Sequence, residues 1–200
     1  MEQTKQYEYV DLGLPSGLKW AKCNVGAEKE TDDGYYFQWG EITPYTDYTW
    51  ADYKYCNGSS TTMTKYCTDS SNGTVDNKTK LEDEDDAARA NMGGDWRMPS
   101  RALMEELMEE TENEWVTNYT GTGVNGRKFT GPNGNSIFIP ASGSRYDSSF
   151  GDQGSDGIVW SSSLYSSSTE QARFLYFDSK DIVANDGNYR ERGYSVRGVL

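Results

Sequence analysis

The sequence predicts an α+β fold of short, irregular β-strands with two helices. Only 34% of its 200 residues are apolar, yet 14% are aromatic, and a disordered chain would lack so many aromatic residues. The abundant Gly, Ser, Thr, Asn and Tyr residues favour short strands joined by long turns. Helix signals occur in two segments, both near the middle of the chain.

Length and charge limit the classes of partner. The chain fits one domain over residues 1–200, with room for a sizeable core. A net charge of −13 would repel a phosphate backbone, so we expect no nucleic-acid partner. A mean hydropathy of −0.86 without a long apolar run predicts no membrane insertion. Residues 1–5 carry no secretory signal, so either the protein is not exported by that route or a leader was removed.

The first half of the chain predicts strands followed by a long polar segment. Residues 7–12 alternate like an edge or pairing strand, residues 13–17 turn the chain, and residues 18–21 form a second strand. The aromatic run GYYFQWGE at 34–41 is typical of a core and its edge rather than of a binding stripe. Residues 43–80 are polar and rich in tyrosine and turns. A loop of this length in a compact domain is usually functional or an ordered insertion.

Two helices are predicted in the middle of the chain. The first runs from Asp83 to Asn91, because acidic residues suit a helix N-terminus and the glycines at 93–94 stop it. The second begins after Pro99 with Ser100 as its N-cap. Its buried and solvent faces follow helical spacing, with Leu103, Met104, Leu107 and Met108 on one and Glu105, Glu106, Glu109 and Glu110 on the other.

The sequence favours neither a metal site nor a cofactor. The acidic run at 82–86 would attract a cation, but it lacks the interleaved spacing and glycine of a calcium loop, so a solvated helix start is the better interpretation. Without histidine, a zinc site would need cysteine or carboxylate ligands at non-standard spacing. Cys56 and Cys67 lie in similar settings and would bridge a long loop. Buried or idle thiols, Cys23 included, are the favoured interpretation.

Beyond Trp115 the pattern is that of an all-β segment. Residues 127–130 and 136–140 flank GPNGN at 131–135, which is a clear hairpin turn signal. Further short strands follow and return the chain to where it began; they are predicted at 157–163, 172–178, 181–184 and 193–199.

Seven motifs occur in order along almost the whole chain. They are VDLGLPSGLKWA (10–21), YFQWGE (36–41), DDAA (85–88), GGDWRMPS (93–100), GPNGNSIFIPA (131–141), WSS (160–162) and GYSVR (193–197). Together they resemble the Fibrobacter succinogenes major paralogous domain, abundant in gut Bacteroidetes, and the related variable proteins of diversity-generating retroelements. The resemblance implies a C-type-lectin-like fold, related in architecture to formylglycine-generating enzymes, in which Trp96, Trp160 and Arg197 belong to the scaffold.

The resemblance also implies where a ligand would bind. In the retroelement proteins, adenine-directed mutagenesis rewrites a C-terminal region, and the varied side chains form the ligand-contacting face. Residues 143–197 correspond to this variable segment. Ten residues in it fall where the family tolerates substitution: Tyr146, Asp147, Ile158, Val159, Leu164, Tyr165, Asp186, Tyr189, Glu191 and Arg192.

Alternation along two strands adds five candidates. If Leu175 and Phe177 pack inward, their neighbours face water, and exposed aromatic residues beside charges suit recognition. The split assigns Phe174, Tyr176, Asp178, Asp181 and Val183 to the recognition face, and Trp160, Leu175, Phe177, Ile182, Ala184 and Val196 to its support. The competing interpretation is that the candidates are ordinary surface residues of a β-rich module.

These observations predict a non-enzymatic, receptor- or adhesin-type domain for a protein or glycan ligand, at a cell surface, extracellular, or on a phage virion. The triplets that hold calcium and sugar in lectins (EPN or QPD, and WND) are absent. One alternative is a structural or assembly module attached to a surface fibre or phage tail. Another is a formylglycine-generating-type enzyme, but that chemistry needs a late cysteine pair, and all three cysteines here precede residue 70.

Overall fold

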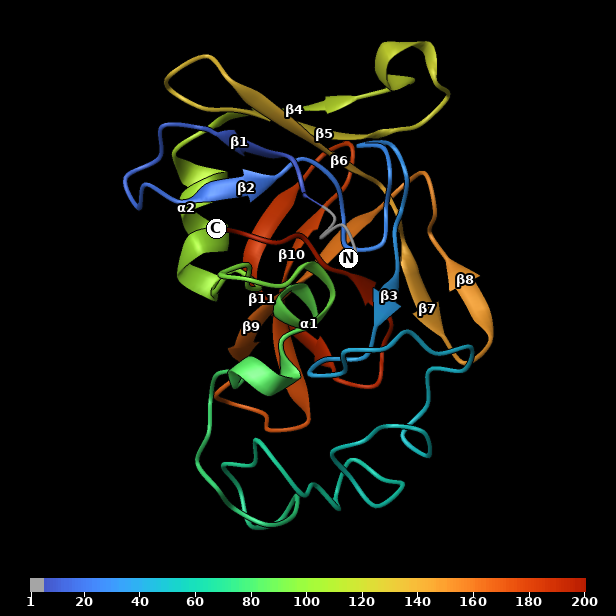
Figure 1. The fold of residues 1–200 in the computed structure, drawn as a ribbon. Helices are drawn as coiled ribbons and strands as arrows, with labels where there is room; N and C mark the ends of the chain where they lie inside the picture. The colour runs from blue at the N-terminus through green and yellow to red at the C-terminus, as the bar shows by residue number, and fades with distance from the viewer. Residues whose placement is uncertain (1–5) are drawn as a thin grey trace, which may run out of the picture.

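The computed structural model describes residues 6–200 and confirms an α+β architecture (Figure 1). Its middle is a five-stranded sheet in the order β11-β10-β9-β12-β3. In this sheet β12 runs parallel to β9, and the other neighbouring pairs are antiparallel. The strands are β3 (Tyr36–Phe37), β9 (Gly157–Leu164), β10 (Gln171–Phe177), β11 (Ile182–Tyr189) and β12 (Tyr194–Ser195).

Smaller sheets surround the five-stranded sheet. β1 (Tyr9–Asp11) pairs with β2 (Lys19–Ala21), β7 (Ser144–Tyr146) pairs with β8 (Ser149–Gly151), and β4 (Glu112–Val116), β5 (Gly126–Thr130) and β6 (Ser136–Pro140) form an antiparallel meander. The predicted hairpin turn at 131–135 joins β5 to β6 and is confirmed. The chain also ends near its start, as predicted, because Lys19 and Leu200 exchange two backbone hydrogen bonds of 2.9 Å.

Both predicted helices are present, although the first begins later than expected. The acidic residues form a 3-10 turn, η1 (Asp83–Asp85), and α1 (Ala87–Met92) starts only after Asp86, whose carboxylate accepts from the backbone N–H of Arg89. The second helix, α2 (Arg101–Glu109), begins as predicted, with the Ser100 hydroxyl accepting from Leu103 N–H. No helix of residues 6–200 is long and apolar enough to cross a membrane.

The central strands β9 and β10 are buried on both faces, which corrects one prediction. Phe174 is 6% exposed and packs 6.2 Å from Trp160, centroid to centroid, in a core cluster that includes α1. Leu175 and Phe177 face the opposite side, where they join residues of α2 and of the β4-β5-β6 sheet in a second cluster. Alternating side chains along a strand imply a solvent-exposed face only when one side of the sheet is uncovered. Here both sides are covered.

The prediction that Phe174 faces solvent is therefore wrong, and the same prediction is wrong for four other contact residues. The buried five are Ile158, Val159, Leu164, Phe174 and Glu191. The predicted support is confirmed: Trp160, Leu175, Phe177, Ala184 and Val196 are buried, and Ile182 packs half-buried against the second cluster. The other ten predicted contact residues are at least partly exposed.

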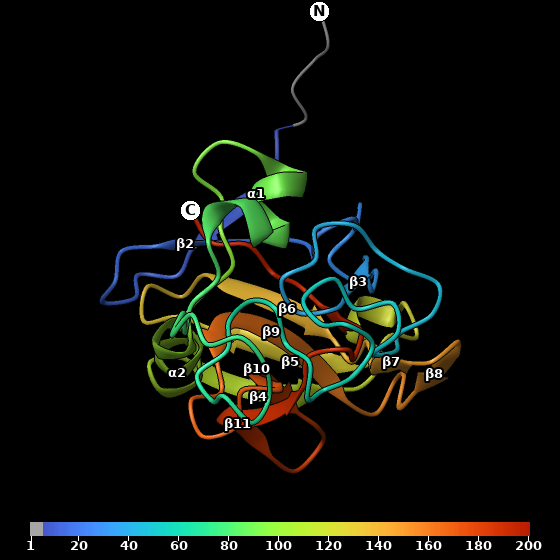
Figure 2. The same ribbon diagram turned by 90° about the horizontal axis from the view of Figure 1, so that it is seen from below.

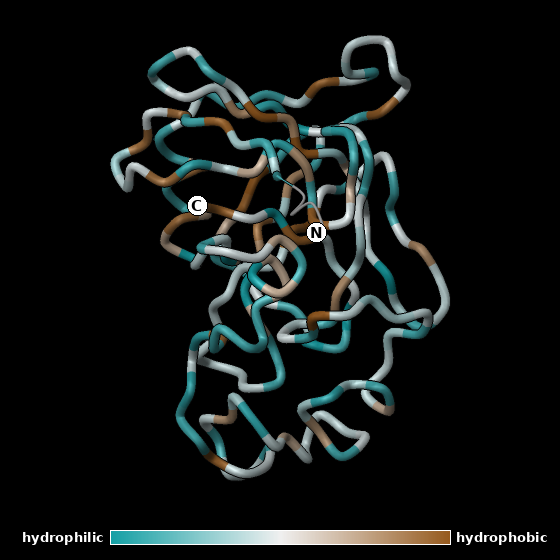
Figure 3. Tube along the Cα trace, viewed as in Figure 1, coloured by the Kyte–Doolittle hydropathy of each residue, from teal (hydrophilic) through white to brown (hydrophobic). Residues whose placement is uncertain are grey.

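Residues 43–80 form an ordered insertion that lies across one end of the five-stranded sheet (Figures 1 and 2). It contains no helix or strand and few hydrophobic stretches compared with the central strands (Figure 3). Isolated bridges such as Cys56 with Met63 hold its turns together. It contributes Tyr53, Tyr55 and Tyr66 to the core, whereas Tyr45 at its start is exposed.

The insertion is fastened to the sheet by Arg190, whose side chain is fully buried just after β11. Its Nε donates to the Tyr53 hydroxyl at 2.7 Å, and its Nη1 donates to the carbonyls of Tyr66 and Thr169 at 3.0 and 2.9 Å. Its Nη2 donates to the carbonyl of Lys65 at 3.0 Å. One guanidinium group thus donates hydrogen bonds to three residues of the insertion.

The insertion contains no disulfide, so the alternative of a bridge between Cys56 and Cys67 is wrong. All three cysteines are free, and Cys67 is buried, as the favoured interpretation expected. The Cys56 thiol donates to the carbonyl of Trp50 at 3.1 Å, and the Cys67 thiol donates to that of Asp69 at 3.1 Å.

The burial of Phe174 gives a direct test of the two-sided core. Phe174→Ala should lower the free energy of unfolding by about 3–5 kcal/mol, because it removes a ring from a covered face and leaves a cavity. Tyr189→Ala, at a ring that is 40% exposed, should cost less than about 1 kcal/mol. Urea unfolding measures both, and equal losses would contradict this placement of Phe174.

Candidate ligand-binding hollow

A hollow of about 360 Å³ opens where the insertion meets the β7–β8 hairpin and the turn after β11. Its volume falls at the small end of the roughly 300–1,000 Å³ range of ligand pockets. We call it the binding hollow; its lining consists of Thr49, Trp50, Ser60, Tyr146, Asp147, Tyr189, Glu191 and Arg192. Five of these were predicted as contact residues. The three from the insertion were missed, and the only sequence signal for them was the unusual length of that segment.

Hydrogen bonds between distant segments build the hollow. The side-chain amide of Gln38 donates to the carbonyls of Thr49 and Glu191 at 3.0 and 3.1 Å, which joins the insertion to the turn after β11. Tyr48 and Asp147 exchange two backbone hydrogen bonds of 3.1 Å, which joins the insertion to the β7–β8 hairpin. The walls are therefore fixed by tertiary contacts rather than by one local motif.

The hairpin and the turn after β11 meet at a glycine. Gly193 and Arg145 exchange backbone hydrogen bonds of 2.8 and 2.9 Å. A Cβ atom at position 193 would lie 2.4 Å from the ring of Tyr48 and 2.8 Å from the Cβ of Arg145, so this close approach requires glycine. The contact holds β7, and with it Tyr146, beside the turn.

Aromatic rings stand around the opening of the hollow. Tyr146 is 51% exposed and Tyr189 is 40% exposed. The guanidinium of Arg192 lies 3.6 Å from the Tyr146 ring centroid, and the Trp50 ring meets that of Tyr189 edge-on at 6.0 Å. Because these contacts restrict the rings before a ligand arrives, binding would cost little conformational entropy.

Glu191 is the buried acid of the hollow, with a side chain only 4% exposed. Its Oε1 lies 3.7 Å from Nε of Arg192, which is longer than a hydrogen bond. Burial raises the pKa of Glu191 to about 7, although a backbone hydrogen bond and the charge of Arg192 act in the opposite direction. A buried acid of this kind in a hollow marks a functional-site candidate.

Ten predicted contact residues lie outside the hollow: Ile158, Val159, Leu164 and Phe174 are buried in the core, and the other six are at least partly exposed. The register of β10 and β11 sets Tyr176 opposite Val183, and Gln171 opposite Tyr189, so the two ends of this strand pair carry separate groups. The group farther from the hollow comprises Tyr176, Asp178, Asp181 and Val183; Tyr176 is half-buried and donates to Asp178. The other two are Tyr165, whose ring lies against Gly187, and Asp186 beside it. The predicted face is thus not one continuous surface.

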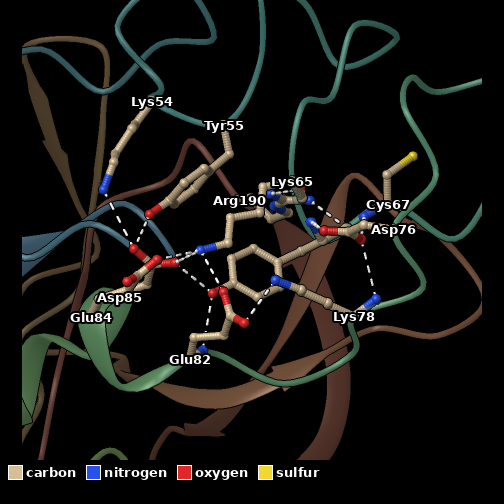
Figure 4. A network of polar contacts seen from close by, with 11 residues as sticks. Lys54, Tyr55, Lys65, Cys67, Asp76, Lys78, Glu82, Glu84, Asp85 and Arg190 are labelled. Carbon is tan, nitrogen blue, oxygen red and sulfur yellow. Dashed lines mark hydrogen bonds and ion pairs between the residues drawn. The ribbon is translucent and has the colours of Figure 1, made fainter.

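The acidic run before α1 is the solvated helix start that the sequence favoured only in part: Asp83 and Glu84 are exposed, whereas Asp85 and Asp86 are buried. Asp85 is 1% exposed and accepts from the hydroxyls of Tyr55 and Tyr66 (Figure 4). The ammonium of Lys65 lies among three carboxylates, 2.7 Å from Glu82, 3.0 Å from Glu84 and 2.6 Å from Asp85.

The cation of this cluster is supplied by the chain itself. Burial lowers the pKa of Lys65, but hydrogen bonds to the three carboxylates outweigh that effect and leave its pKa raised. Burial likewise raises the pKa of Asp85, and its hydrogen bonds from Lys65 and the two tyrosines leave it lowered. The cluster is therefore a charge network that closes the insertion, and its carboxylates are already paired.

A larger hollow, of about 550 Å³, contains none of the predicted contact residues. It lies beside Lys22 and Cys23, where Lys22 pairs with Glu8 at 2.9 Å on the surface. We place the candidate site at the binding hollow because exposed rings, a buried acid and five predicted residues meet there.

Comparison of the chain with protein-family models, with curated proteins and with solved structures gave no match. The family resemblance drawn from the seven motifs therefore stays a prediction.

The raised pKa of Glu191 predicts how stability depends on pH. A carboxyl whose pKa is higher in the folded state favours folding when protonated, and this stability is lost as pH rises from about 4.5 through about 7. Glu191→Gln removes the titration, so its stability relative to wild type should improve by up to about 3 kcal/mol between pH 4.5 and pH 8.

Urea unfolding at both pH values measures this difference. Asp69→Asn is the control, because hydrogen bonds from Ser71 lower the pKa of Asp69 and leave it ionised across the range. The difference in free energy of unfolding between Asp69→Asn and wild type should be the same at both pH values. If the difference for Glu191→Gln is also the same at both, Glu191 is not buried as described.

Proposed function

We propose that this chain is a non-enzymatic ligand-binding domain and that the binding hollow is the centre of its recognition surface. The observation that carries the proposal is the ring of partly exposed aromatic side chains, Trp50, Tyr146 and Tyr189, around a hollow with a buried acid. Recognition sites concentrate their binding energy in a few aromatic and arginine anchors surrounded by polar contacts. Arg192, stacked on Tyr146, adds such an anchor.

We propose further that the fold is C-type-lectin-like and that the chain resembles the variable proteins of retroelements in how it separates scaffold from contact residues. In support, the motif residues Trp96, Trp160 and Arg197 are buried. Arg197 donates to Asn24 and to the carbonyls of Ala21 and Phe138, which joins the first strands to β6. Motif residues thus support the fold, whereas the lining of the hollow comes mainly from outside the motifs.

Binding suits this lining better than catalysis does. A buried acid with a pKa near 7 is also what a general acid needs. Hydrolysis by two carboxylates requires a partner acid, and Asp147 is the only other one in the lining. Neither histidine nor cysteine lines the hollow to act as base or nucleophile. The ligand we propose is a protein or glycan met at a cell surface, with the domain itself displayed there or on a phage virion.

The aromatic rim is tested by paired substitutions. Tyr146→Ala with Tyr189→Ala should abolish binding to ligands found on arrays of glycans and bacterial surface proteins, because it removes the exposed anchors. It should leave the melting temperature within a few degrees of wild type. Tyr9→Ala with Tyr35→Ala is the matched control, since each ring is 46% exposed elsewhere on the molecule.

Two results would contradict the proposal. One is binding that survives the Tyr146 and Tyr189 substitutions, or that the control pair reduces equally. The other is an obligate oligomer, detected by size-exclusion chromatography with light scattering, whose interface buries Tyr146 and Tyr189. That result would instead support the alternative of an assembly module.

A further inference from the structure

We infer that the binding hollow takes a neutral sugar unit, a pyranose ring whose hydroxyl groups pair with Glu191 and Arg192 while its C–H face lies on Tyr189 or Tyr146. This inference rests on the proposed function and adds the chemical class of the ligand. Its starting point is a group of polar atoms at the hollow that the protein leaves without partners.

Unpaired polar atoms gather at this corner of the molecule. Among residues 6–200, seven buried side-chain polar atoms have no hydrogen-bond partner, and four of them belong to Gln38, Arg145, Glu191 and Arg192. Glu191 and Arg192 line the hollow; Gln38 donates to the carbonyl of Glu191, and the backbone of Arg145 pairs with Gly193. Buried polar groups are almost always paired, so a concentration of unpaired ones points to a missing partner molecule.

The two unpaired atoms of the lining need opposite kinds of partner. Glu191 Oε2 accepts when the acid is ionised, and Nε of Arg192 only donates. A hydroxyl group both donates and accepts, so adjacent hydroxyls on one ring serve both atoms as water would. The ion pair that holds Arg192 over Glu191 is 3.7 Å long and is not a hydrogen bond. Neither atom of this pair therefore spends its hydrogen-bonding capacity on the other, and both are free to bond to a ligand.

The charges around the hollow disfavour an acidic ligand. A carboxylate would approach Asp147 and Glu191, whereas the attraction of these two acids for an ammonium group is offset locally by the positive charge of Arg192. The net charge of −13 further repels acidic sugars and phosphates over longer distances. The combination of aromatic faces with polar groups of both signs thus matches a ring that is apolar on one face and hydroxylated at its rim.

The volume of about 360 Å³ limits the occupant to a short group rather than an extended segment. Trp50, Tyr146 and Tyr189 stand at the opening, so the sugar unit would be a terminal one that enters between rings. Additional units of a glycan would then extend outward over the exposed surface.

The test uses methyl glycosides of glucose, galactose, mannose and N-acetylglucosamine as neutral probes. The charged comparison probes are methyl glucuronide, a methyl sialoside and N-acetyl-lysine methylamide. Binding to the full chain is followed by saturation-transfer NMR and by tryptophan fluorescence, with EDTA present so that no divalent cation contributes. We expect at least one neutral glycoside to bind with a millimolar dissociation constant, without turnover, and at least tenfold more tightly than any charged probe.

Substitutions assign the binding to the hollow. Glu191→Leu fills a similar space without a hydrogen-bond acceptor and should raise the dissociation constant of the neutral glycoside at least tenfold. Tyr189→Ala, at an exposed ring, should weaken this binding as much while its melting temperature stays within a few degrees of wild type, so the test does not depend on the folding of one variant. The Tyr9→Ala and Tyr35→Ala pair should bind like wild type.

The outcomes separate this inference from the proposed function. One outcome is that no neutral glycoside binds, while a protein ligand binds and requires Tyr146 and Tyr189. This outcome would overturn the sugar inference and leave the proposed binding function in place. Preferential binding of the lysine probe, or glycoside binding that survives Glu191→Leu, would also overturn it. If the wild-type chain binds nothing on either the glycan array or the array of bacterial surface proteins, both the sugar inference and the proposed binding function are overturned.

Discussion

The buried guanidinium of Arg190 is the interaction on which the rest of the structure depends. It connects the end of the five-stranded sheet to an insertion that has no helix or strand of its own. The acceptors in its hydrogen bonds are neutral oxygens, and removing the arginine would leave them unpaired at a cost of about 1–3 kcal/mol for each one that stays buried. The network of Lys65 and Asp85 holds the same insertion next to this arginine, whose Nη2 donates to the Lys65 carbonyl (Figure 4).

The same arginine positions the binding hollow. Arg190 stands between Tyr189 and Glu191 in the chain, so fixing its side chain and backbone fixes a rim residue and the buried acid together. Gln38 then joins Glu191 to the insertion beside Trp50, which also lines the hollow. The hollow is consequently a product of the anchored insertion.

Local signals in the sequence were enough to predict the hairpin at 131–135 and the start of α2 at Ser100, because turn residues and an N-cap act over a few positions. Phe174 was misplaced because alternation does not say what covers the second face of a strand. Trp50 was missed because it reaches the hollow through contacts with residues far along the chain. Glu191 was predicted as an exposed contact residue; it is buried, although it lines the hollow, because a single sequence does not show what covers a side chain.

Hydrogen exchange of Arg190→Met tests the central claim most directly, with Arg101→Met, at a partly exposed ion pair on α2, as the control. The account predicts that insertion amides such as Met63 and Thr64, which bond to Asn72 and Tyr55, lose protection in Arg190→Met. The amides of β5 and β6 should lose much less, and the control should match wild type. Unchanged protection of the insertion in Arg190→Met, or a loss spread evenly over all sheets, would contradict the account.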